Sequence, residues 1–356
     1  MPRSNKLRIY ILVFLVSFSI LIGSSYNTYL SYERFYNPDS ETYTNTARFN
    51  FEDQSLVRKY RIIVPFLANI TTWPIGKLYY KIFKDKRDVH DWPLLTGFFI
   101  VNAFLMSLSA VFIFAIMRHK RISMAGCVIG ISAFLTGGRW ASFLTGHPVT
   151  DSLTILCIAM VIYGLIRPKY TILYFGIIIG LLSKESVLLF YPMILLFSTG
   201  NRLKVLASML GALSLYFLLK YGIDQLSGTD LTASLQQDLD HTANIELSLR
   251  KLFSPKGVGD LFSVYGFFCL PLLTGIFYKS FRDKISVYFD KLFLVFLLTI
   301  IVHMLLSTEL ARMFYLGSAI FIPLLAKSFE IHPAVIKILQ PSQVDVDTNA
   351  SNEDLK

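Results

Sequence analysis

Residues 94–117 read LLTGFFIVNAFLMSLSAVFIFAIM, a stretch without a charged side chain, and RHKR follows directly at 118–121. A helix of about 20 apolar residues is long enough to cross the hydrocarbon core of a bilayer. A cluster of Lys and Arg directly after such a helix is typical of its cytoplasmic end. The stretch therefore predicts both a membrane-spanning helix and its orientation.

The rest of the chain repeats this pattern. Of the 356 residues, 54% are hydrophobic and 16% are charged, whereas about 25% are charged in ordinary soluble domains. This composition excludes a soluble enzyme. The candidate spans are 8–25, 94–117, 122–138, 150–166, 170–183, 186–200, 203–222, 260–278, 287–306 and 311–327. We expect an all-α, polytopic transmembrane bundle of about 10 spans in residues 1–330, followed by a disordered cytoplasmic tail at 331–356.

The net charge of +10 is carried by short clusters between the apolar blocks. Such clusters indicate topology and attraction to lipid headgroups, so membrane lipids are expected partners and nucleic acid is not. The three cysteines all lie inside apolar blocks, and the six histidines have no metal-ligand spacing. We therefore expect neither a disulfide framework nor a metal site.

The orientation of the bundle depends on residues 61–86. The cationic loops at 118–121, 167–169 and 202–204 all fall on the cytoplasmic side only if this segment does not cross the membrane. We therefore expect two short amphipathic helices on the outer surface, with a break near Trp73-Pro74. The first outer loop then runs from 26 to 93, and a second from 223 to 259.

With this topology, nine unusual polar residues lie on the outer side. They are Asp39, Glu41, Arg139, His147, Asp151, Lys184, Glu185, Glu309 and Arg312. The topology was derived without them, so their convergence on one side predicts an outward-facing polar cavity.

Lys184 and Glu185 are the most informative pair. They lie near the middle of a 31-residue segment, Tyr170 to Gly200, whereas two full crossings need about 40 residues. The helices must be short, or form a re-entrant hairpin, and the charged tip then lies below the outer surface. A charged side chain at that depth is costly unless it lines a water-filled cavity or is paired with an opposite charge. An ion pair that only holds helices together is the alternative interpretation.

The other polar residues also have purely structural interpretations. Asp39 fits a turn or a helix N-cap, and Asp151 fits the first turn of a helix, where an acid suits the helix dipole. Arg139 fits an interfacial anchor, and Glu309 with Arg312 fits a pair on one helix face. His303, inside an apolar span, is expected to be a hydrogen-bonded packing residue.

Five short motifs follow one another along the chain. An acidic residue follows the first helix, here Asp39, and a Tyr-Arg-x-x-x-Pro segment follows in the same loop, here Tyr60 to Pro65. A Thr-Asp begins a later helix at Thr150-Asp151. The last two motifs are Lys184-Glu185 before Pro192, and Glu309-x-x-Arg312 before Pro323. Together these motifs resemble the GT-C superfamily of polytopic glycosyltransferases.

This resemblance implies an enzyme that moves a sugar from a polyprenyl-phosphate-linked donor to a glycan, lipid or protein acceptor on the non-cytoplasmic face. It implies that Asp39 is the catalytic base, since a carboxylate in a partly dry cavity suits that task. The donor-phosphate ligands would be Lys184, Arg61, Arg139 and Arg312. The orienting or acceptor-binding residues would be Glu41, His147, Asp151, Glu185 and Glu309. The scheme requires no cofactor, and the expected location is a bacterial inner membrane with the site facing the periplasm or exterior.

Two other classes remain open at this stage. A polysaccharide polymerase of the O-antigen type would use outer-loop arginines, and Arg250 with Lys251 lies in the second outer loop. A transporter or lipid flippase would be expected to have duplicated halves and charges spread through the membrane depth. The chain has no visible internal repeat, and its unusual charges gather on one side.

Overall fold

The computed structural model describes residues 3–31, 38–52, 54–55, 57–82, 91–200, 202–228 and 242–339, and these residues form helices and no strand. The all-α prediction is confirmed for them. The first half contains α1 (Arg3–Leu30), α2 (Pro38–Ala47), η2 (Arg58–Tyr60), α3 (Ile63–Ile82), α4 (Trp92–His119), α5 (Met124–Thr136), α6 (Arg139–Gly146), α7 (Asp151–Ile166), α8 (Tyr170–Ser183), η3 (Glu185–Phe190) and α9 (Tyr191–Phe197).

The second half begins with the long helix α10. Its elements are α10 (Arg202–Ser227), α12 (Thr242–Leu252), α13 (Pro255–Tyr265), η4 (Gly266–Cys269), α14 (Leu270–Gly275), α15 (Lys279–Ile285), η5 (Ser286–Tyr288), α16 (Lys291–Leu306), α17 (Leu310–Leu316), α18 (Ser318–Ile331) and α19 (Pro333–Leu339). The expected tail at 331–356 thus begins with a short helix, and residues 340–356 lie outside the described residues.

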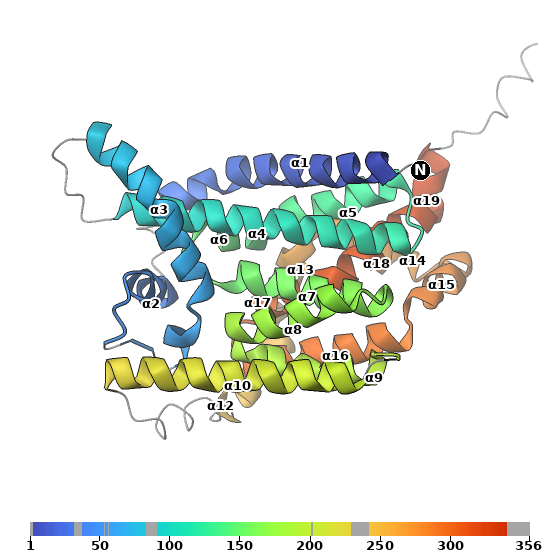
Figure 1. Cartoon of the computed structure of the whole chain (residues 1–356). Helices are drawn as coiled ribbons and strands as arrows, with labels where there is room; N and C mark the ends of the chain where they lie inside the picture. The colour runs from blue at the N-terminus through green and yellow to red at the C-terminus, as the bar shows by residue number, and fades with distance from the viewer. Residues whose placement is uncertain are drawn as a thin grey trace, which may run out of the picture.

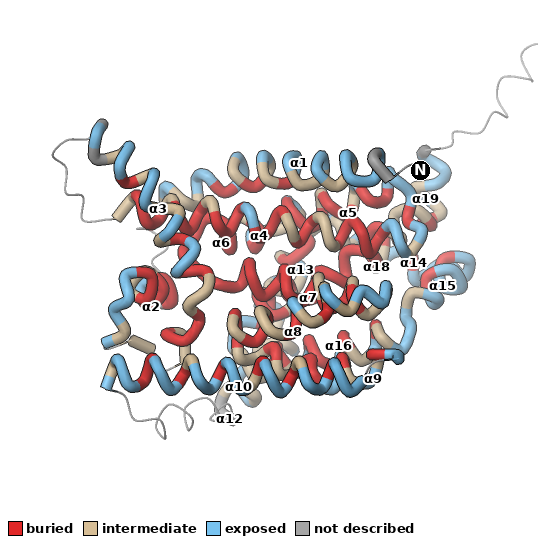
Figure 2. Tube along the Cα trace, viewed as in Figure 1, coloured by how far each residue is buried: buried red, intermediate tan, exposed pale blue. Residues whose placement is uncertain are grey.

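Helix α4 is the centre of the bundle. It packs against α1, α3 and α7, and it lies between the outer helices α1 and α10 in Figure 1. Figure 2 shows that burial is densest along α4 and α7, whereas α1 and α10 alternate between buried and exposed residues. The exposed residues of these two helices include large apolar side chains such as Leu12 and Leu218. Exposed apolar stripes on the outermost helices are the pattern expected of a bundle surrounded by lipid.

Four helices are long and apolar enough to cross a membrane, or seven segments if each bent pair of helices counts as one span. The four are Asn5–Leu30, Trp92–His119, Arg202–Ser227 and Pro255–Gly275. The sequence predicted about ten spans. The difference comes from three short apolar segments, α7, α8 and Glu185–Phe197. Helices α7 and α8 have only 16 and 14 residues, and Glu185–Phe197 is shorter still, so all three have fewer than the roughly 17 residues that a spanning helix needs.

Helix α3 corrects one prediction. Two helices with a break near Trp73-Pro74 were expected, but α3 is a single helix with Pro74 inside it. A proline removes one backbone donor, and α3 packs against α4. The approach is close at Gly97, where a Cβ would lie 2.4 Å from the carbonyl oxygen of Ala68. Helix α3 is not among the four long candidate spans.

The short hairpin between α7 and α10 agrees with expectation. Helix α8 ends at Ser183, and η3 begins at Glu185. Lys184 therefore occupies the turn between them. Because α8 is short, this turn lies deep within the fold, and the side chain of Lys184 is only 8% exposed.

Candidate functional site

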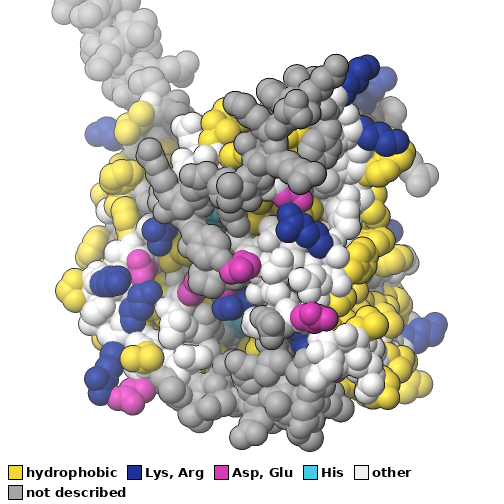
Figure 3. Space-filling view, turned by 90° about the vertical axis from the view of Figure 1, so that its left-hand side faces the viewer, with side chains coloured by type: hydrophobic (Ala, Val, Ile, Leu, Met, Phe, Trp, Pro, Cys, Tyr) yellow, Lys and Arg dark blue, Asp and Glu magenta, His cyan; other side chains and the backbone are white. Residues whose placement is uncertain are grey.

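One end of the bundle contains a cavity of about 720 Å³. Its walls come from α2, η2, η3, α10, α12, α16 and α17. Figure 3 looks onto this end, where acidic and basic side chains are intermixed and apolar ones gather along the flanks. The charged residues that line the cavity are Asp39, Arg58, Arg61, Lys184, Glu185, Glu309 and Arg312. Six of these seven are among the residues that the sequence analysis selected.

Arg312 is the centre of the charged cluster. Its Nη1 lies 2.6 Å from a Glu309 carboxylate oxygen and 3.3 Å from one of Asp39, and its Nη2 donates to Asp151. The Arg312 side chain is 4% exposed. A guanidinium keeps its charge even when buried, and its planar fork suits several carboxylates at once. Arg312 therefore joins residues of α2, α7 and α17.

Lys184 belongs to the same cluster through Asp151. Its Nζ lies 2.9 Å from Asp151 Oδ1, and Asp151 is fully buried between Lys184 and Arg312. Asp151 also begins α7, so the helix dipole favours its negative charge. The pairing that the structural interpretation of Lys184 required is therefore present. Lys184 still lines the cavity, so the same contact leaves its ammonium beside the space that a ligand would fill.

Arg61 connects the loop before α3 with the hairpin tip. Its Nε and Nη2 donate to the two Glu185 oxygens at 3.1 and 2.5 Å, and its Nη1 donates to the Tyr43 hydroxyl at 2.9 Å. Burial opposes the charge of Arg61, but Glu185 and Tyr43 raise its pKa above the ordinary value. The guanidinium therefore stays protonated at the cavity wall.

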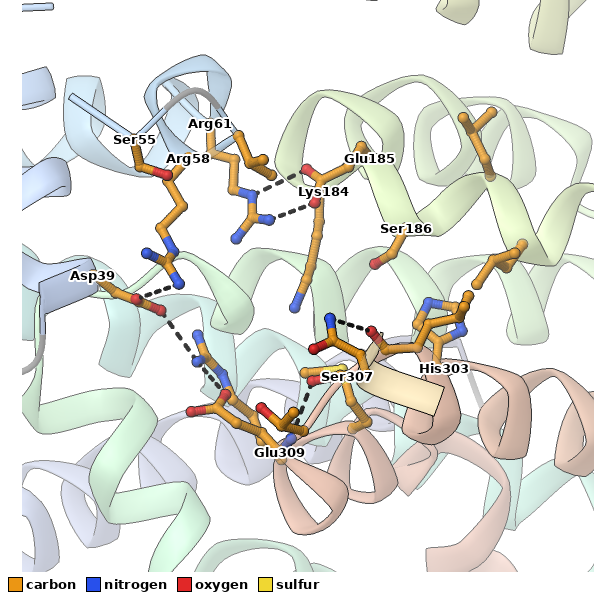
Figure 4. Close-up of a pocket in the computed structure, with 18 of the residues that line it drawn as sticks. Asp39, Ser55, Arg58, Arg61, Lys184, Glu185, Ser186, His303, Ser307 and Glu309 are labelled. Atoms are coloured by element: carbon orange, nitrogen blue, oxygen red, sulfur yellow. Dashed lines mark hydrogen bonds and ion pairs between the residues drawn. The ribbon is translucent and has the colours of Figure 1, made fainter. Parts of the chain in front are cut away.

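Asp39 lies in the first turn of α2, consistent with the helix-start interpretation, and it also lines the cavity. Its two oxygens are held by different arginines, Arg58 at 2.9 Å and Arg312 at 3.3 Å. Figure 4 shows Asp39 facing the Arg58 side chain across the cavity edge. The Arg58 side chain is 38% exposed, so Arg58 is the most exposed cation of the cluster.

Arg58 was not selected from the sequence. A 3-10 helix has about three residues per turn, so residues three apart lie on the same side. In Arg58-Lys59-Tyr60-Arg61 the two arginines therefore face the cavity together. Lys59 and Tyr60 turn away and contact Asp224 of α10 at 2.9 and 2.5 Å. The sequence feature that could have identified Arg58 is the group of three cationic residues within the four positions 58–61.

Three residues that the sequence selected lie away from the cavity. Arg139 is exposed and lies over the Trp140 ring at 5.1 Å, which agrees with the interfacial-anchor interpretation. Glu41 is exposed in the first turn of α2. His147 is buried against the Phe143 ring at 4.6 Å, and burial lowers its pKa to about 4. None of the three lines the cavity.

The residues that favoured a polymerase also lie elsewhere. Arg250 pairs with Glu246, and Lys251 pairs with Asp260 at 2.9 Å. Neither basic residue lines the cavity.

His303, expected to be a hydrogen-bonded packing residue, does contact the Thr299 carbonyl oxygen through Nδ1 at 3.1 Å. It also lines the cavity. Across the described part of the chain, no three His, Cys, Asp or Glu side chains are grouped closely enough to hold a metal ion. Comparison with family models, curated proteins and solved structures finds no match to the chain, so its function is inferred from the cavity and its charges.

Proposed function

We propose that the chain is a membrane-bound glycosyltransferase that moves a sugar from a polyprenyl-phosphate-linked donor to an acceptor hydroxyl. One observation carries this proposal: Arg312 gathers Asp39, Asp151 and Glu309 at the wall of a large cavity in an apolar helical bundle. A cluster of buried, ordered charges in such a bundle is typical of a binding or reaction site.

The cavity has a cationic wall and an apolar wall, and together they support a lipid-linked phosphate as the ligand. Arg58, Arg61 and Lys184 provide cationic donors for phosphate oxygens. Leu188, Leu189 and Phe217 form an apolar wall beside them. A prenyl chain would pack along the apolar wall and leave its phosphate among the cations.

Asp39 is the proposed base for the acceptor hydroxyl. Its two oxygens are each held by a guanidinium group, one of Arg58 and one of Arg312. Arg58 is the more exposed partner, so a donor phosphate would draw its guanidinium away and release one Asp39 oxygen. Phosphate binding would then prepare the base in the same step that binds the donor.

The proposed topology puts this cavity on the non-cytoplasmic side of about ten spans, some of them short. Helix α3 would lie along the outer surface, and the cationic clusters after α4 and α7 would lie inside. In a bacterium, the site would face the periplasm. Helix α3 supports this arrangement because it is not one of the long apolar helices.

The proposal is tested by a transfer assay in reconstituted vesicles. The donors are polyprenyl phosphates that carry a radiolabelled hexose or pentose, and the acceptors come from membrane extracts. We expect label from at least one donor to appear in a lipid-, glycan- or protein-linked product. Movement of intact donor across the bilayer without transfer would instead assign the protein to the flippases. Neither transfer nor donor binding across the panel would overturn the proposal.

A further inference from the structure

Two polar groups on the far side of the cavity from Asp39 have no hydrogen-bond partner. They are Ser186 Oγ of η3 and His303 Nε2 of α16, and both are buried and unpaired among the residues that the structure describes. His303 is 2% exposed, and both residues line the cavity. Figure 4 shows them near each other, with Asp39 on the opposite side. Buried polar groups are nearly always hydrogen-bonded, so this pair points to a missing partner.

The hydrogen bond of Nδ1 determines whether His303 Nε2 acts as a donor or as an acceptor. Nδ1 lies 3.1 Å from the Thr299 carbonyl oxygen, and a carbonyl oxygen only accepts. Nδ1 of the neutral ring therefore carries the proton, and Nε2 presents a lone pair. The Phe190 ring, whose centre lies 5.0 Å from that of the imidazole, packs against it and holds this orientation. A ligand at Nε2 must therefore donate a hydrogen bond.

A hydroxyl group has the donor and the acceptor that these two residues need. It donates to the His303 nitrogen and accepts from the Ser186 hydroxyl, whereas an ionised phosphate oxygen only accepts. Arg58 lies toward the Asp39 side and suits the phosphate. The cavity thus has an end for an anion and an end for a hydroxyl.

We propose that Ser186 and His303 form the subsite that binds a ring hydroxyl of the transferred sugar. This assignment rests on the proposed glycosyltransferase function and adds the position of the sugar within the cavity. The donor would lie with its phosphate near Arg58 and Arg61, and with its sugar ring turned toward η3 and α16. The two residues would select hexoses or pentoses that bear a hydroxyl at the position facing them.

The test compares two ligands on the whole protein in lipid nanodiscs. The probes are bare polyprenyl phosphate and polyprenyl phosphates that carry one hexose or one pentose. The wild-type protein should bind at least one sugar-bearing probe more tightly than the bare lipid. Ser186→Ala and His303→Phe should each weaken that binding about fivefold to tenfold, since each removes one neutral hydrogen bond. Binding of the bare lipid should not change.

A matched control and the opposing results complete the test. Ser208→Ala alters a half-buried serine of α10 that bonds the Val205 carbonyl outside the cavity, and it should leave both affinities unchanged. If both variants keep the sugar-dependent gain, or if they weaken the bare lipid equally, the subsite assignment is overturned. If the wild-type protein binds none of the probes, the proposed function itself fails. Ser186→Ala keeps the test valid if His303→Phe does not fold.

Discussion

Arg312 contacts three carboxylates from three segments of the chain, whereas Lys184 contacts one of them. Breaking a buried ion pair costs roughly 3–5 kcal/mol when it leaves a charge without a partner. Loss of Lys184 leaves Asp151 paired with Arg312. Loss of Arg312 leaves Asp39 and Glu309 with fewer counterions. The two cations of one cluster should therefore differ in their contribution to stability.

We therefore expect Arg312→Met to lower the unfolding temperature in detergent far more than Lys184→Met. The lysine variant should remain folded and correctly inserted, and it should bind polyprenyl-phosphate donor more weakly, because one phosphate ligand is gone. Thermal unfolding and donor binding measure the two effects. A Lys184→Met protein that is unstable, yet binds donor normally in its folded fraction, would make Lys184 purely structural.

Asp39 provides the chemical prediction. Asp39→Asn should keep the fold, since Arg312 retains Asp151 and Glu309, and it should reduce sugar transfer by a factor of about 10² or more. Glu41→Gln is the matched control, because Glu41 lies two residues away on the same helix and does not line the cavity. The transfer rates of the two variants are compared at the same concentration of donor in the membrane. Near-normal transfer by Asp39→Asn would remove Asp39 from the mechanism.

His147 predicts how stability depends on pH. Its pKa in the folded protein is about 4, below the ordinary value of 6.5, because burial disfavours the charged ring. The unfolded chain therefore takes up the proton first as the pH falls. The unfolding temperature should be highest above pH 6.5 and should decline as the pH falls toward 4. His147→Asn should flatten that decline, and an unchanged profile would contradict the assignment.

At the scale of residues, the sequence predicted which residues belong to the charged cluster better than it predicted which of them contact each other. Asp151, Lys184, Glu185, Glu309 and Arg312 are predictable because each is a charge in or beside an apolar stretch. Asp39 lies in the first outer loop, and its selection depends on the family resemblance. Arg58 was missed because it lies in a mixed loop, where a cation is unremarkable. Arg139 was selected on the same grounds as Lys184. The sequence could not specify that it would begin an exposed turn of α6, away from the cavity.

At the scale of elements, α3 controls the position of the cavity loop. Arg61 lies two residues before the start of α3. Helix α3 rests on α4 at Gly97, where a Cβ would lie 2.4 Å from the Ala68 carbonyl oxygen. A side chain there forces the two helices apart. The displacement would move Arg61 relative to Glu185, although neither residue lies on α4.

Gly97→Val should therefore reduce sugar transfer by about tenfold or more, as expected when catalytic groups shift by about 1 Å. The helical content should change little. Gly211→Val is the control, because a Cβ at Gly211 of α10 would meet nothing within 4 Å. Circular dichroism and the transfer assay separate the two effects. Equal transfer by both variants would show that the α3–α4 approach does not position the loop.

The elements themselves were predictable where hydropathy is long and unbroken, as in α4 and α10. The bends were not. The span expected at 122–138 contains α5, and α6 follows it at an angle of 57°. Helices α17 and α18 meet at 79° within the span expected at 311–327. At Gly138 a Cβ would lie 1.9 Å from the carbonyl oxygen of Ser263. The bend thus lies where a distant segment approaches closely, and local hydropathy carries no information about that approach.

At the scale of the whole molecule, the charged cavity and the basic loops lie toward opposite ends of the bundle. The cavity is at the end that carries α2 and η2, and α4 leads from beside α3 to His119 near the other end (Figure 1). The positive-inside rule applied to RHKR at 118–121 puts that second end in the cytoplasm. The proposed orientation follows from these two facts together.

Cysteine labelling in intact cells tests this orientation. In a variant without the native cysteines, His119→Cys should react only after the membrane is opened, whereas Glu52→Cys, exposed on the cavity side, should react directly. An impermeant maleimide makes the distinction. Direct labelling at position 119 would reverse the orientation and place α3 across the membrane.

The charged cluster among the described residues contains as many cations as anions. It consists of Arg58, Arg61, Lys184 and Arg312 with Asp39, Asp151, Glu185 and Glu309. Opposite charges this close cancel at a distance, and salt screens what remains. The cavity therefore exerts little long-range pull on anions dissolved in the surrounding water. A ligand must be delivered by its own affinity for the bilayer, so ionic strength should hardly alter the rate at which it arrives.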